Sequence, residues 1–260
     1  MSEYTDKFTI VISAPHGALG EYLAALLEHT VNHDTSVDLR SPKLSNRPSQ
    51  AFFHDMEYMF ANQDAQTSFA EFVNSWAGQL PTEPDTRVIL TSQQIADVVE
   101  AFPNSKIINI NTTTADANQL GFNYFIKESA MAGKTTPELN KFKYKAEQLF
   151  GPTEQVIDWD YIATDPQVLD NAPAQYVIKL LGATLCSRTN MDTSACASPA
   201  LDINFAELCN VTTKNHAADN ALAIAKIYDF LDVLATQELE TVQNIWIDFM
   251  DSFTSYRDIG

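Results

Sequence analysis

Cysteine is scarce in this chain. The three cysteines, Cys186, Cys196 and Cys209, are too few and too far apart to form a disulfide scaffold. No Cys-x-x-Cys pair is present that would suggest a zinc site. We therefore expect three reduced thiols and no bound metal ion.

The sequence also lacks a secretory leader and long hydrophobic runs. Its first residues show no basic region followed by an apolar one, and no stretch of about 18 uninterrupted apolar residues occurs. These absences predict a cytoplasmic protein.

Basic residues are few relative to acidic ones. The chain has 16 Lys and Arg against 34 Asp and Glu, a formal net charge of −18 with neutral histidines. Such a surface repels the phosphates of nucleic acids and anionic lipid headgroups. We expect neither nucleic-acid nor membrane partners, and the charge leaves protein partners open.

Short apolar runs rich in β-branched residues alternate with segments of helical periodicity. They predict strands at residues 8–13, 87–90, 106–110 and 155–159, and helices follow the first three. Parallel strands need crossovers of about a dozen residues, which helices usually supply. The pattern predicts an α/β fold, a parallel sheet flanked by helices, with the first three strands side by side.

The last third of the chain is predicted to be mainly helical. Helical spacing occurs at residues 174–181, 219–234 and 238–253, whereas residues 182–213 look irregular. We find no repeat and no linker, so we expect a single α/β domain over residues 1–260, whose sheet-forming core is residues 1–160.

The turn after the first strand is the first place to look for a ligand. In ISAPHGALGEYLAALL the strand leads through Pro15 and two glycines into a helix that begins near Gly20. The N–H groups and dipole of a helix N-terminus can hold a phosphate or sulfate. However, no Lys or Arg occurs from residue 8 to residue 39, His16 is the only cation candidate, and Glu21 would repel an anion. An anion site and a merely structural turn are both open.

Three segments carry a resemblance in their order and spacing. They are IVISAPHGALGEYLAALL, RVILTSQQIADVVEAFPNSKIINI and INTTTADANQLGFNYF, within roughly residues 8–160. Together they resemble the sulfotransferase branch of P-loop proteins, especially the divergent sulfotransferase-like proteins of marine bacteria and their phages. The first segment is similar to the family's 5′-phosphosulfate loop, the second to a Thr-His pair before a helix and strand, and the third to its 3′-phosphate site.

The resemblance implies 3′-phosphoadenosine 5′-phosphosulfate as the cofactor of an active member. It places the phosphosulfate loop at His16, Gly17, Ala18, Leu19 and Gly20. His16 stands where the family has a basic residue, and Leu19 and Gly20 stand near its hydroxyl residues.

The other functional positions have also changed. Ser92, after Thr91, stands where the family has its catalytic histidine, and a serine cannot replace a base whose pKa lies near the working pH. Asn111 stands in place of the 3′-phosphate arginine, and Gln119 near its serine. Sulfuryl transfer needs positive charge where oxygens gather negative charge, and almost none is visible here.

The leading hypothesis is therefore a sulfotransferase-like fold with a degenerate phosphosulfate site, acting as a non-catalytic binding or structural component. If the chain is phage-encoded, the expected location is the host cytoplasm or the virion, and a role in the virion or its assembly follows naturally. The alternative is an active, divergent sulfotransferase that brings cations from residues 40–47 or 127–145. A third hypothesis is another P-loop-like nucleotide enzyme.

Other constellations favour structural interpretations over functional ones. His29 and His33 are spaced for one helix face but lack the Glu of a zinc protease. Asp158 and Asp160 follow a predicted strand, where a turn or capping role outweighs magnesium binding. Lys141, Lys143 and Lys145 suit a solvated face. The aromatic stripe at residues 246–256 should pack on the body of the domain.

Overall fold

The computed structural model describes the central sheet and the helices around it. The described residues are 9–15, 17–33, 71, 87–91, 98–100, 102–117, 119–121, 123, 193, 197–209, 216–233 and 236–255.

Among the described residues, four parallel strands form the sheet, in the order β2-β1-β3-β4. They are β1 (Thr9–Ser13), β2 (Val88–Thr91), β3 (Ser105–Asn111) and β4 (Ala200–Asn204). Ile10 of β1 is paired with Ile89 of β2 and with Lys106 of β3. The prediction that the first three strands lie side by side in one parallel sheet is therefore confirmed.

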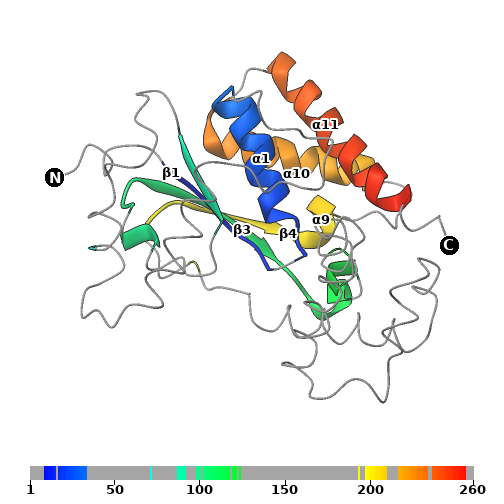
Figure 1. The fold of residues 1–260 in the computed structure, drawn as a ribbon, viewed down its shortest axis with the longest axis horizontal. Coiled ribbons are helices and arrows are strands. Elements are labelled where there is room, and N and C mark those ends of the chain that lie inside the picture. Colours follow the sequence, from blue (N-terminus) through cyan, green and yellow to red (C-terminus); the bar gives the residue numbers. More distant parts are fainter. Residues whose placement is uncertain are drawn as a thin grey trace, which may run out of the picture.

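Helices cover one face of this sheet, as Figure 1 shows for α1, α10 and α11. The α-helices are α1 (Gly20–Val31), α9 (Phe205–Cys209), α10 (His216–Leu231) and α11 (Thr236–Ser255), and a short 3-10 helix, η2 (Thr114–Asp116), follows β3. The expected helices at residues 219–234 and 238–253 correspond to α10 and α11, whose ends differ from the expected ones by two or three residues. The C-terminal helices pack against each other. The fold is α/β with a parallel sheet.

The segment at residues 182–213 was expected to be irregular, and that expectation is wrong, because it contains β4 and α9. In β4 only Leu201 and Ile203 are apolar and turned toward the helices, whereas Ala200, Asp202 and Asn204 are exposed. Two apolar residues at alternate positions are too short a pattern to separate a strand from a loop.

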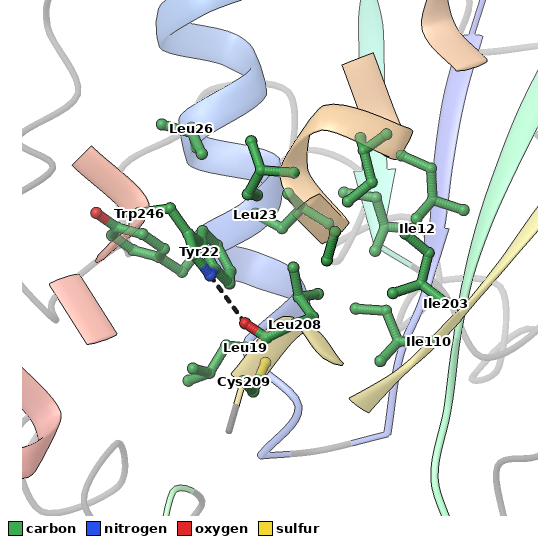
Figure 2. Close-up of a cluster of buried hydrophobic side chains, with 14 of the residues drawn as sticks. Ile12, Leu19, Tyr22, Leu23, Leu26, Ile110, Ile203, Leu208, Cys209 and Trp246 are labelled. Carbon is green, nitrogen blue, oxygen red and sulfur yellow. Dashed lines mark hydrogen bonds between the residues drawn. The ribbon is translucent and has the colours of Figure 1, made fainter. Parts of the chain in front are cut away.

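The hydrophobic core lies between the sheet and the helices on this face. Alternate strand residues such as Ile12, Ile110 and Ile203 meet Leu23 and Leu26 of α1 (Figure 2). Because side chains alternate across a strand, these positions define the helix-covered face.

The aromatic side chains of α11 complete this core. Trp246 is fully buried, and its indole Nε1 donates a hydrogen bond of 2.9 Å to the carbonyl oxygen of Leu208 (Figure 2). Phe249 stacks on Tyr22 of α1 at an interplanar angle of 7°. Burial of the phenol, and secondly the charge of Asp248, raise the pKa of Tyr22 above its ordinary value. For Trp246, Phe249 and Met250, packing on the body of the domain is confirmed.

Lys106, at the amino end of β3, links the sheet to α10. From β3 its Nζ donates to the carbonyl oxygens of Phe230 and Leu231, at 2.7 and 3.2 Å, at the C-terminal end of α10. A cation there satisfies carbonyl groups that the helix leaves unpaired and opposes the negative end of its dipole. None of the helices in the described part of the chain has the length and apolar character needed to cross a membrane.

Several predicted elements lie outside the described residues. They include the strand at 155–159, the helix at 174–181 and most of the helical segment before Pro103. The thiols of Cys186 and Cys196 are likewise outside, whereas Cys209 is a buried free thiol.

Candidate functional site

The order of the strands indicates where a ligand site belongs. From β1 the chain passes to β2 on one side, and from β3 it passes to β4 on the other side. The connections that leave β1 and β3 therefore diverge at the carboxyl ends of two neighbouring strands. In parallel α/β sheets such a switch point opens the crevice in which ligands bind. The turn at residues 14–20 and the segment after Asn111 flank it.

The turn after β1 is shaped by two residues with positive φ. Gly17 has φ 89°, and Leu19, the N-cap of α1, has φ 59°. The N–H of Ala18 donates to the carbonyl oxygen of Pro15 at 3.0 Å, which closes the turn. The helix begins at Gly20, as the sequence predicted.

The side chain of Leu19 belongs to the hydrophobic core, where it is only 8% exposed. A left-handed conformation costs an L-residue roughly 1–2 kcal/mol. Burying a leucine side chain contributes about 1.5–3 kcal/mol, so the burial offsets the backbone strain. This position therefore anchors the turn to the core.

Gly20 leaves no room for a side chain. A Cβ atom built at Gly20 would lie 2.7 Å from the Cβ of Ala14 and 3.5 Å from Cγ2 of Ile12. The first distance is far shorter than a van der Waals contact, so any larger residue forces the start of α1 away from the end of β1. The glycine thus serves close helix–strand packing.

Two donors from distant segments fix the carbonyl groups of this turn. Nδ2 of the fully buried Asn123 donates to the oxygen of Gly17 at 3.1 Å, and Nε2 of Gln119 donates to Oδ1 of Asn123 at 2.8 Å. The thiol of Cys209 donates to the oxygen of Ala18, with an S···O distance of 3.6 Å. Burial, and secondly the charge of Asp116, hold the pKa of this thiol well above its ordinary value. Cys209 is therefore a neutral thiol that binds the turn, rather than a nucleophile.

A row of polar side chains crosses the carboxyl ends of three strands. Ser13, Asn109 and Asp202 are neighbours in register on β1, β3 and β4. Nδ2 of Asn109 donates to Oδ1 of Asp202 at 2.7 Å and to Oδ1 of Asn111 at 3.0 Å, and Nδ2 of Asn111 donates to the same Asp202 oxygen at 3.0 Å. This row lies on the face of the sheet opposite the α1 core, since its members alternate with the core isoleucines.

A second carboxylate occupies the turn after β3. Oδ2 of Asp116 accepts hydrogen bonds from the N–H and from Oγ1 of Thr113, at 2.7 and 2.9 Å. This capping box places a negative charge at the start of the helical segment that carries Gln119. Asp116 also raises the pKa of Cys209, which contacts the turn after β1. The negative charge of Asp116 therefore acts close to that turn.

The structure brings only some of the predicted site residues together. Gln119 and Gly17 are joined through Asn123, whereas Asn111 is bonded to Asp202 on the far side of β3. His16 and Ser92 lie outside the described residues. Sequence reasoning missed Asn109, Asp202 and Asn123, although an asparagine inside the apolar run of β3 was a usable signal.

Cations in the described part of the chain do not converge on the turn. The lysines and arginines among the described residues are Arg87, Lys106 and Lys226. Arg87 and Lys106 lie at the amino ends of β2 and β3. Lys226 forms a 2.9 Å ion pair with Glu207, and its hydrogen bond is the main reason that the pKa of this carboxyl is lowered.

The remaining candidates are placed in part. His29 is in the last turn of α1, whereas His33 follows the C-cap Asn32 and has φ 56°, so the two are not on one helical face. Within the described ranges no group of three His, Cys, Asp or Glu side chains could hold a metal ion. Asp158, Asp160 and the lysines at 141–145 lie outside these ranges.

Comparison of the chain with protein-family models, with curated proteins and with solved structures finds no match in any of the three. The fold and the site define only a class. The described residues form an α/β protein with a four-stranded parallel sheet and polar side chains at the carboxyl ends of its strands.

Proposed function

We propose that this chain is a sulfotransferase-like α/β protein whose phosphosulfate site has degenerated, and that it acts as a non-catalytic binding or structural component. If a phage encodes it, a role in the virion or its assembly fits this proposal. The resemblance supplies the family, and the geometry of the turn after β1 supports the loss of chemistry.

The observation that carries the proposal is the use of the turn as a corner of the core. Leu19 and Gly20 stand near the positions where the resemblance expects hydroxyl residues. Leu19 is buried among core side chains, and a Cβ at Gly20 would meet Ala14 at 2.7 Å. A hydroxyl residue at Gly20 would therefore disrupt the β1–α1 contact.

Electrostatics at the switch point support the same conclusion. Phosphosulfate chemistry draws most of its acceleration from donors and cations aimed at developing negative charge, and the loss of one such donor typically costs about 10²–10³ in rate. Here the N-terminus after β3 is already capped by Asp116, and Asn111 donates to the carboxylate of Asp202. The carboxylates of Asp116 and Asp202 would both repel a sulfuryl or phosphoryl oxygen.

A transfer assay tests the proposal. Purified protein is incubated with 3′-phosphoadenosine 5′-phosphosulfate and phenolic, sugar or steroid hydroxyl acceptors, beside an active sulfotransferase as positive control. We expect no product above the uncatalysed background. Transfer above that background, abolished by Arg40→Ala, Arg47→Ala or Lys127→Ala, would contradict the proposal and support the active, divergent alternative.

A further inference from the structure

We draw no further inference here: the strongest candidate, the side-chain pair of His216 on α10 and Asp251 on α11, whose Nε2 and Oδ1 atoms lie 3.2 Å apart, joins two helices that the hydrophobic core already holds together, and nothing among the described residues ties its titration to a ligand, a partner or the switch point.

Discussion

The helix-covered face of the sheet and the carboxyl ends of its strands differ in the polarity of their side chains. The first is apolar, with Trp246, Tyr22 and the strand isoleucines buried, and the indole Nε1 of Trp246 donates to a backbone carbonyl oxygen. The second carries two amides, Asn109 and Asn111, that bond to one carboxylate, Asp202. The turn after β1 lies where the two meet, yet its residues Ala18 and Leu19 belong to the hydrophobic core. A turn at a switch point can thus be part of the hydrophobic core.

The largest effect should come from breaking the apolar side of this comparison. Trp246→Ala removes a fully buried side chain and leaves the carbonyl of Leu208 without its indole donor. We expect a loss of about 3–5 kcal/mol in the free energy of unfolding, measured by urea denaturation. Leu222→Ala is the control, because that side chain is 57% exposed, and should change stability by less than about 0.5 kcal/mol. Similar losses in both variants would contradict the assignment of the core.

A second substitution tests whether the turn is a packed corner. In a helix, Gly→Ala usually stabilises by about 1 kcal/mol. Here Gly20→Ala should destabilise the protein by about 1–3 kcal/mol, because the new Cβ would meet Ala14 at 2.7 Å.

Ala14→Gly in the same chain removes that contact and should recover most of the loss, so a double-mutant cycle would show strong coupling. A stabilising effect of Gly20→Ala alone would show that the turn is open and would revive the anion-loop hypothesis.

The smallest effect concerns a pair beside the polar end. Hydrogen bonds from Lys226 and Asn204 lower the pKa of Glu207, so its ionised form favours the folded state. That stabilisation is present at neutral pH and is lost as pH falls through the lowered pKa. Both side chains are more than a third exposed, so Glu207→Gln should cost only about 0.2–1 kcal/mol at pH 7.

The difference between Glu207→Gln and the wild type should shrink as pH falls and vanish below the lowered pKa of Glu207, where both carboxyl and amide are neutral. It should also shrink in high salt. A difference that grows toward low pH would mean that ionised Glu207 does not stabilise the folded state, contrary to this account.

The parts of the fold that the sequence predicts are those in which hydrophobic burial alone decides. β1, β2 and β3 carry apolar residues on both faces, and α10 and α11 show apolar residues at helical spacing. β4 is different, because one of its faces is exposed and only Leu201 and Ile203 supply an apolar pattern.

The same limit applies to the candidate site. The turn, its helix start and the positive φ of Gly17 follow from local sequence. The hydrogen bonds from Asn123 and Cys209 to that turn join residues separated by more than 100 positions. Asn111 and Asp202, which are also hydrogen-bonded, lie 91 positions apart. A single sequence offers no signal for such pairs, so the residues that turn the loop into a core element emerge only from the structure.

The central claim is that the turn after β1 is a packed corner and no longer an anion cradle, and thermal unfolding with adenosine 3′,5′-bisphosphate tests it most directly. A ligand at about 100 times its dissociation constant stabilises a fold by roughly 2.7 kcal/mol, which raises the melting temperature by several degrees. We predict no shift at pH 8 with millimolar ligand, and at most a small one near pH 6, where His16 would be protonated. A shift of several degrees at pH 8 that Arg40→Ala, Arg47→Ala or Lys127→Ala abolishes would contradict the account, because it would show a working anion site supplied with cations from elsewhere in the chain.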